Sequence, residues 1–211
     1  MDRSSERERM VRRQIAGRGV GDPAALEAMR SVPRHEFVPA EHRDRAYADR
    51  PLPIGRGQTI SQPYIVAYMT EALELSPEDR VLEVGTGCGY QTAVLAEIAR
   101  EVWSVEIVPS LARRAALTLR ELGYENARVV AGDGRRGLPG AAPFDAILLT
   151  AAPPRVPDPL FEQLAEGGRL VAPVGAGFSQ TIRRWRRRDA ELETEKLIGV
   201  RFVPMTGDSG S

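Results

Sequence analysis

The chain has 211 residues, enough for one α/β domain and too few for two large ones. Its 29 basic and 29 acidic residues give a formal net charge of zero, so the summed charge does not favour binding to nucleic acid or to an anionic membrane. Hydrophobic residues make up 42% and charged residues 27%, which is typical of globular proteins.

The single cysteine, Cys88, excludes an internal disulfide and is typical of a reducing compartment. The first residues, MDRSSERERMVRRQ, lack the apolar segment of a secretory signal. No apolar run has the length needed to cross a bilayer. We therefore expect a cytoplasmic monomer with no membrane or nucleic-acid partner.

Two helices are expected at the start of the chain. Residues 3–18 can form the first, with its apolar positions near one face. Asp22 is placed as an N-cap, and Pro23 as the first residue of a short helix that runs to about Arg30.

A segment rich in proline and glycine, residues 31–62, follows these helices. Ordered loops of that length inside a domain usually have a function, so this segment is expected to contribute to a site. A helix is expected next, over Tyr64–Leu75.

The sequence VLEVGTGCGYQT at 81–92 is the main functional motif. A short apolar run containing Glu83 leads into three alternating glycines, Gly85, Gly87 and Gly89, and then into a helical stretch. This pattern predicts a buried strand, a tight loop and a helix N-terminus, where an α/β fold binds a nucleotide-like ligand. Glycine also allows a positive φ and a close approach to main-chain N–H groups.

The glycine spacing indicates S-adenosylmethionine as the ligand. A dinucleotide fingerprint would need its third glycine where Tyr90 stands, and no Lys-Ser/Thr pair follows to make a phosphate-binding loop. The form here, E-x-G-x-G-x-G, is the one used for S-adenosylmethionine. Glu106, at the end of the next apolar strand, can accept hydrogen bonds from both ribose hydroxyls.

Strands and helices alternate regularly from Arg80 onward. The alternation predicts a doubly wound, mostly parallel sheet, preceded by an N-terminal helical and loop extension and followed by an antiparallel hairpin. We expect a single domain with an extension at 1–62, a cofactor-binding core at 63–175 and a hairpin at 176–211. The expected strands are 81–85, 102–106, 128–131, 144–150, 168–174, 179–187 and 191–203, and the expected helices of the core are 90–99, 109–122 and 157–165.

Two further segments follow strands at the same edge of the predicted sheet. Asp133 and Gly134 follow the third strand, where a carboxylate and an N–H could meet an adenine edge. Asp133 could equally be a simple turn residue when it is considered alone. The segment TAAPP at 150–154 follows the fourth strand.

Several stretches together resemble the protein-L-isoaspartate (D-aspartate) O-methyltransferase family. They occur in the family's order across nearly the whole chain. The stretches are LPIGRGQTISQP at 52–63, VPRHEFVP at 32–39, RVLEVGTGCGYQTAVLA at 80–96, SVE at 104–106, GDG at 132–134, PFDAILLTAAPP at 143–154, EGGRLVAPVG at 166–175 and RFVPM at 201–205. Cys88 is a departure, since the family commonly carries serine there.

The resemblance implies repair of damaged proteins. Methyl transfer from S-adenosylmethionine to the free α-carboxylate of an L-isoaspartyl residue would give an ester, with S-adenosylhomocysteine as the other product. The ester cyclises to a succinimide, whose hydrolysis returns part of the material to aspartate. The acceptor carboxylate is already ionised at neutral pH, so we expect no general base, and the presence of only two histidines, His35 and His42, agrees with this. The sequence has no metal-ligating cluster, so we expect no metal either.

The resemblance also implies roles for particular residues. Ser61 is expected to be the catalytic residue, whose hydroxyl donates to one oxygen of the acceptor carboxylate. Val203 is expected to contact the substrate together with Ser61. The expected cofactor-binding residues are Thr59, Ile60, Glu83, Gly85, Thr86, Gly87, Glu106, Ile107, Asp133, Gly134 and, more weakly, Thr206.

Several alternatives remain open on the sequence alone. A methyltransferase of the same fold could act on RNA or on a small molecule, although TAAPP replaces the stacking motif expected for base methylation. A cofactor-binding adaptor without activity is a third possibility. The segment 201–205 could bind a peptide main chain or be an ordinary edge strand, and the arginine run 183–188 could bind phosphates or be a solvated face neutralised by acids such as Asp189, Glu191 and Glu193.

Overall fold

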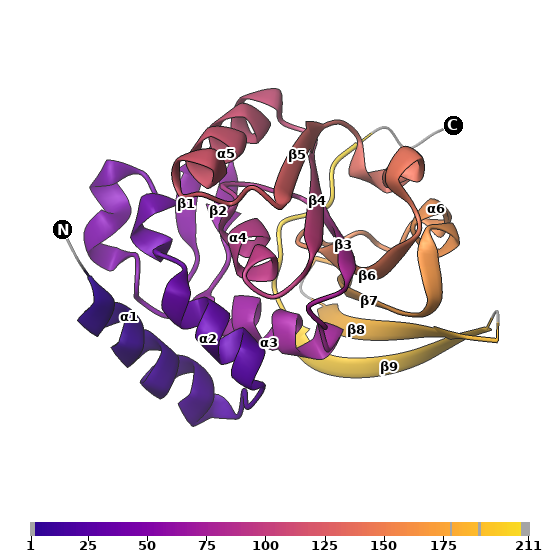
Figure 1. The fold of residues 1–211 in the computed structure, drawn as a ribbon, viewed down its shortest axis with the longest axis horizontal. Coiled ribbons are helices and arrows are strands. Elements are labelled where there is room, and N and C mark those ends of the chain that lie inside the picture. Colours follow the sequence, from indigo (N-terminus) through magenta and orange to yellow (C-terminus); the bar gives the residue numbers. More distant parts are fainter. Residues whose placement is uncertain (1–2, 178, 190, 208–211) are drawn as a thin grey trace.

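A seven-stranded sheet with the order β5-β4-β3-β6-β7-β8-β9 forms the centre of the computed structural model, which describes residues 3–177, 179–189 and 191–207 (Figure 1). Strands β3 to β7 are parallel, while β8 and β9 continue the sheet as an antiparallel hairpin. The doubly wound fold with a C-terminal hairpin is therefore confirmed. The strands are β3 (Arg80–Val84), β4 (Glu101–Glu106), β5 (Ala127–Ala131), β6 (Phe144–Leu149), β7 (Leu164–Ala176), β8 (Ser179–Arg188) and β9 (Glu191–Val200).

The N-terminal helices form where the sequence predicts them. Residues 4–18 are helical throughout, although the helix changes type along its length, and Gly19 ends it with a φ of 100°. The Asp22 carboxylate accepts the N–H of Ala25 at 2.9 Å, so this residue caps the next helix as expected. The helices are α1 (Ser4–Met10), a π-helical turn (Val11–Ile15), a 3-10 turn (Ala16–Arg18), α2 (Pro23–Ser31), α3 (Pro63–Leu73), α4 (Tyr90–Ala96), α5 (Pro109–Glu121) and α6 (Asp158–Glu162).

The two faces of β3 pack against different layers. Val81 packs among residues of α3 and α4, whereas Leu82 and Val84 pack on the opposite face with residues that include Leu160 of α6. This division follows from the alternation of side chains along a strand. Because both faces are covered, the strand is apolar along almost its whole length. No helix within the described ranges is long and apolar enough to cross a bilayer.

The proline- and glycine-rich segment is ordered and lies beside the cofactor-binding core. It contains two 3-10 helices, Arg34–Glu36 and Ala40–Arg45, and the hairpin of β1 (Leu52–Gly55) and β2 (Gln58–Ile60). Arg114 of α5 donates to the Ile54 carbonyl at 2.6 Å, which attaches this hairpin to the core. In Figure 1, β1, β2 and the N-terminal helices gather at one side of the molecule, opposite the hairpin of β8 and β9.

The expected strand over 191–203 is wrong at its end, because β9 stops at Val200. The Gln180 side chain bonds to Phe202 instead, accepting its N–H at 2.5 Å and donating to its carbonyl at 3.2 Å. The chain then pairs with Ala152, which donates to Val203 and accepts from Met205, both at 2.9 Å. Residues 201–205 therefore leave the sheet and cross to the end of β6.

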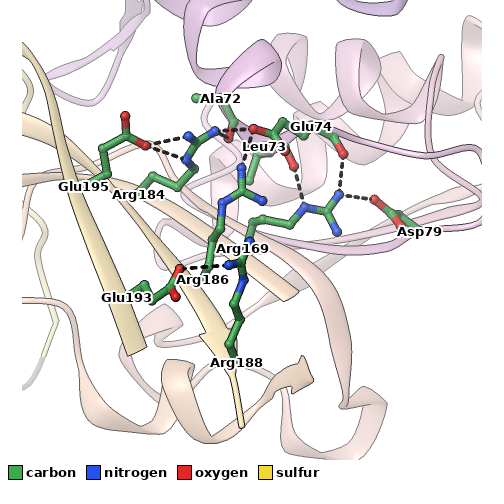
Figure 2. A network of polar contacts seen from close by, with 10 residues as sticks. All are labelled: Ala72, Leu73, Glu74, Asp79, Arg169, Arg184, Arg186, Arg188, Glu193 and Glu195. Carbon is green, nitrogen blue, oxygen red and sulfur yellow. Dashed lines mark hydrogen bonds and ion pairs between the residues drawn. The ribbon is translucent and has the colours of Figure 1, made fainter. Parts of the chain in front are cut away.

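The arginine run lies on β8, where alternate side chains share a face (Figure 2). On one face, Arg184 lies between Glu195 and Glu74, and Arg186 also binds Glu74. Arg188 lies 3.6 Å from Glu193 on that face. The expectation that acids neutralise this face is confirmed, but only Glu193 is among the acids that the sequence singled out, and it pairs with Arg188. Glu74 and Glu195 neutralise Arg184 and Arg186 instead.

Candidate functional site

A cavity opens at the carboxyl ends of β3, β4 and β6. This is the edge of a doubly wound sheet at which ligands bind. Residues from the glycine loop, the strand ends, the β2–α3 connection and the C-terminal segment line it. The lining residues are Gln58, Thr59, Ile60, Ser61, Val66, Val84, Gly85, Thr86, Gly87, Cys88, Tyr90, Gln91, Val105, Glu106, Ile107, Val108, Gly134, Thr150, Ala151, Val203, Pro204, Met205 and Thr206.

The glycine loop needs glycine for two physical reasons. Gly85 has a φ of 103° and Gly87 a φ of 56°, values that side-chain-bearing residues rarely adopt. A Cβ at Gly85 would also stand 2.3 Å from the Thr150 hydroxyl oxygen. That hydroxyl donates to the carbonyls of Val84 and Gly85, so Thr150 at the end of β6 closes the loop against β3.

Glu106 ends β4 and points its carboxylate at the loop. Its Oε2 accepts the N–H of Gly87 at 2.8 Å, and its Oε1 accepts the N–H of Val108 at 2.9 Å. A carboxylate has about four lone-pair positions, so each oxygen can accept a further bond from a ligand in the cavity. The structure therefore places Glu106 where a ribose could bind, as the sequence predicts.

Glu83 lies beneath the loop and does not line the cavity. It is fully buried and accepts bonds from the hydroxyls of Thr92 on α4 and Ser104 on β4. Burial raises the pKa of this carboxyl to about 8, against the partial opposition of those two bonds, so it is protonated at neutral pH. Ser104 also lies 2.5 Å from the Thr86 hydroxyl, so Glu83 supports the loop from behind and does not contact a ligand directly.

Asp133 and Gly134 differ in their placement. Gly134 lines the cavity, and a Cβ there would come within 2.4 Å of Val84 Cγ1. Asp133 is not among the lining residues, and its carboxylate accepts the N–H of Arg135 at 3.0 Å, as a turn residue would. Its neighbour in space is Gly207 at the end of the C-terminal segment. The direct contact predicted for Asp133 therefore has less support than that for Gly134.

Ser61 lies on a wall shared with a second cavity. No described group bonds to its hydroxyl, which is therefore available to a ligand. Thr59, Thr150, Val203 and Pro204 also belong to both cavities. The second cavity is lined by Arg18, Pro51, Thr59, Ser61, Gln62, Tyr64, Ile65, Thr150, Ile198, Gly199, Val200, Arg201, Phe202, Val203 and Pro204.

The remaining predicted site residues also lie at the first cavity. Ile60, Thr86, Ile107 and Thr206 all line the first cavity. The structure thus brings together every predicted site residue except Glu83 and Asp133.

Sequence reasoning missed residues that hold the walls in place. Asp49 accepts from Arg18 at 2.6 Å and from the Gln62 side chain at 2.8 Å, and the Arg18 guanidinium stacks 3.6 Å from the Tyr64 ring centroid. Arg34 binds the Ser61 main chain. No local signal marked Arg34, because it stands in the polar run Arg34–Glu36 and its partners are distant in sequence.

Cys88 and the possible metal ligands are the remaining chemically reactive side chains to place. The Cys88 side chain is buried, and burial raises the pKa of its thiol to about 11. It is therefore a packed neutral thiol and a poor nucleophile, as expected from its position. Among the described residues, no group of three or more His, Cys, Asp or Glu side chains could hold a metal ion.

The donor and acceptor set of the first cavity fits a nucleoside that carries no phosphate. Its acid, Glu106, suits ribose hydroxyls and would repel a phosphate, and no lysine or arginine lines this cavity. Gly87 and Gly134 let a ligand approach the main chain closely. The second cavity has two arginines, Arg18 and Arg201, in its wall.

Comparisons with known proteins agree on one family. Residues 5–210 match the family described as protein-L-isoaspartate(D-aspartate) O-methyltransferase (PCMT). A protein-L-isoaspartate O-methyltransferase of Picosynechococcus sp. is 58% identical over 203 residues, covering 96% of this chain and 91% of its own. One of the same name from Opitutus terrae is 58% identical over 205 residues, covering 97% and 88%.

Two solved structures have the same fold over nearly the whole chain. A protein-L-isoaspartate O-methyltransferase is 31% identical with a TM-score of 0.87, and the match covers 95% of this chain and 66% of that longer one. A Plasmodium falciparum protein, described as a putative protein-L-isoaspartate O-methyltransferase in complex with S-adenosyl-L-homocysteine, has a TM-score of 0.81 at 22% identity. That match covers 95% of this chain and 98% of the other.

Proposed function

The chain belongs to the protein-L-isoaspartate(D-aspartate) O-methyltransferase family, and from this membership and the site we propose that it transfers a methyl group from S-adenosylmethionine to the free α-carboxylate of L-isoaspartyl residues in damaged proteins and peptides. The observation that carries the proposal is the position of Ser61, which lines both cavities. One cavity then takes the methyl donor and the other the damaged peptide.

The chemical outcome explains why methylation repairs the chain. The carbonyl carbon of a methyl ester is far more electrophilic than that of an ionised carboxylate, so the neighbouring main-chain nitrogen can attack it, lose its proton and expel methanol to form a succinimide. Hydrolysis of the succinimide then gives some normal aspartate. The enzyme needs to perform only the methylation, because the later steps are spontaneous.

The residues at the acceptor side need to orient the substrate and do not need to activate it. An α-carboxylate has an ordinary pKa of about 3.3–3.7, so it is ionised and nucleophilic at neutral pH without a general base. The Ser61 hydroxyl donates to one carboxylate oxygen and leaves the other free to attack. Such alignment can lower the activation free energy by about 7–11 kcal/mol in favourable intramolecular reactions.

The residues at the donor side hold the nucleoside and the amino-acid part of the donor. When bound, S-adenosylmethionine supplies an electrophilic methyl group on a sulfonium. Glu106 would accept hydrogen bonds from the ribose hydroxyls, and Gly87 and Gly134, which have no side chains, would let the ligand approach the main chain closely. Glu83 lies beneath the glycine loop and supports it through its hydrogen bonds with the hydroxyls of Thr92 and Ser104.

Val203 is the proposed second contact of the substrate, since it lines both cavities. The sequence left two interpretations of 201–205 open, main-chain binding of a peptide and an ordinary edge strand, and the segment lies outside β9, which ends at Val200. The Val203 carbonyl and the Met205 N–H are already bonded to Ala152, so these two groups are not available to a peptide. The substrate would therefore meet the Val203 side chain and the groups of this segment that face the cavity.

The alternative substrates, RNA or a small molecule, have no observation in their favour. Arg184, Arg186 and Arg188 are paired with acids, and the two relatives described above, each 58% identical, are both called protein-L-isoaspartate O-methyltransferase. A cytoplasmic location and a monomeric state stay predictions from the sequence.

A paired-peptide assay tests the proposal. We expect base-labile methyl incorporation from labelled S-adenosylmethionine into a peptide that contains L-isoaspartate. The same peptide with normal aspartate is the matched control and should stay unlabelled. Equal labelling of the two peptides, or labelling of neither, would contradict the assignment.

A further inference from the structure

Arg34 is a fully buried arginine beside the site. It begins the 3-10 helix Arg34–Glu36, and its exposed fraction is 0%. The titratable side chains that interact with it are those of Tyr90, Cys88 and Tyr47, which are neutral at pH 7, and burial lowers the pKa of its guanidinium. A buried charge without a counter-charge costs free energy, and an apolar side chain of similar volume is often no less stable. Fold stability alone therefore does not explain an arginine here.

The partners of Arg34 are main-chain carbonyls and an aromatic ring. Its Nε donates to the Ala46 carbonyl at 2.7 Å, and its Nη2 donates to the Ser61 carbonyl at 2.8 Å. Its guanidinium carbon lies 4.8 Å from the centroid of the Tyr90 ring. Because the guanidinium is planar and rigid, it fixes the positions of all three groups relative to one another.

These three contacts connect the two sides of the site. Ser61 stands in the short connection between β2 and α3, where neither strand nor helix fixes its main chain. Tyr90 directly follows the glycine loop and lines the donor cavity. Arg34 thus holds the Ser61 main chain at a fixed position relative to the start of α4. The main-chain position in turn determines where the Ser61 hydroxyl can point.

We propose that Arg34 is a positioning residue for methyl transfer, which holds Ser61 in the orientation that presents its hydroxyl to the acceptor carboxylate. This inference rests on the proposed role of Ser61. Arg34 touches neither substrate nor donor in this account. It acts through the Ser61 carbonyl, so its effect should depend on whether the Ser61 hydroxyl is present.

A double-mutant cycle in the full-length enzyme tests the dependence. The variants are Arg34→Lys, Arg34→Met, Ser61→Ala and each Arg34 change combined with Ser61→Ala. Lysine keeps the charge but loses the rigid fork, and methionine keeps similar length without any donor. We expect each single Arg34 variant to lower kcat for the isoaspartyl peptide about 10- to 100-fold, as small misplacements do. The dissociation constant for S-adenosylhomocysteine should change less than about threefold, a shift smaller than one lost hydrogen bond produces.

The same Arg34 changes should lower kcat less than about threefold when Ser61 is already alanine, because coupled residues are not additive. Arg169→Lys is the matched control. Arg169 also donates to main-chain carbonyls, those of Leu73, Glu74 and Asp145, and it binds the Asp79 carboxylate. These contacts lie on the α3 side of the sheet (Figure 2). Its replacement should lower the melting temperature and leave kcat unchanged.

Three results would overturn the inference. An equal fall in kcat with and without the Ser61 hydroxyl would show that Arg34 acts on the fold in general. Wild-type kcat in Arg34→Met would show that no positioning is needed, and wild-type kcat in Arg34→Lys would show that charge alone suffices. A Ser61→Ala enzyme with full activity would instead contradict the proposed role of Ser61, so the two failures are distinguishable.

Discussion

The Glu106 carboxylate accepts the main-chain N–H of Gly87 at 2.8 Å, which joins the end of β4 to the turn of the glycine loop. The same carboxylate faces the cavity. One side chain therefore shapes the loop and offers acceptors to a ligand. This double use makes Glu106 the most informative position on the donor side.

Replacing Glu106 with glutamine should weaken binding of the donor. The amide group has one acceptor oxygen, and its NH₂ would face the N–H of Gly87 or Val108. Loss of a charge-assisted bond costs about 1.5–3 kcal/mol, which corresponds to roughly 10- to 100-fold in the dissociation constant. Titration calorimetry with S-adenosylhomocysteine measures it. Glu101→Gln, at the opposite end of β4, is the control and should bind normally.

Replacing Ser61 with alanine should slow methyl transfer and leave donor binding intact. The hydroxyl has no partner within the described part of the chain, so its removal breaks no internal bond. One lost hydrogen bond to a carboxylate predicts a fall of about 10- to 100-fold in kcat/KM for the isoaspartyl peptide. Ser76→Ala, before β3 at the far edge of the sheet, should retain full activity. A large loss of donor affinity in Ser61→Ala would show that this residue binds the donor and would contradict its proposed contact with the acceptor carboxylate.

Glu83 should make the protein less stable as the pH rises. Its carboxyl has a pKa of about 8 when folded, raised by burial from a value of 4.5. The folded state therefore holds a proton that the unfolded state has released between those two values. The stabilisation is complete below the unfolded pKa and is lost as the pH rises through the folded one, with a slope of up to about 1.4 kcal/mol per pH unit.

Glu83→Gln should remove this slope, because its amide is neutral at every pH. Urea unfolding of both proteins across this pH range measures the difference in the free energy of unfolding. Parallel curves for the two proteins would contradict a raised pKa at Glu83.

Replacing Glu74 with glutamine should weaken the attachment of β8 to the end of α3. Glu74 accepts from Arg184 and Arg186, and its side chain is half exposed (Figure 2). Exposed ion pairs contribute about 0.2–1 kcal/mol each, so we expect a small loss of unfolding free energy that shrinks at high salt. Urea unfolding at low and high salt measures it. The exposed Glu162 on α6 provides a control, Glu162→Gln, whose stability should not depend on salt in this way, and methylation should be normal in both variants.

The sequence by itself determined the local elements and the chemistry of the donor site. Three alternating glycines after an apolar strand predict a tight loop before a helix, because glycine adopts the positive φ seen at Gly85 and Gly87 without steric cost. Asp22 before Pro23 likewise determines a helix start from adjacent residues. The edge at which Glu106, Gly134 and Thr150 meet follows from the parallel order of the strands.

Only the tertiary structure decided which polar residues face a ligand and which support the walls. Glu83 and Glu106 are both acids within apolar strands of the sequence, yet Glu83 is buried under α4 and Glu106 faces the cavity. The crossing of 201–205 to Ala152 and the bond from Arg34 to Ser61 join segments far apart in the chain. The physical reason is that backbone conformation depends on neighbouring residues, whereas burial and partner choice depend on how distant segments pack.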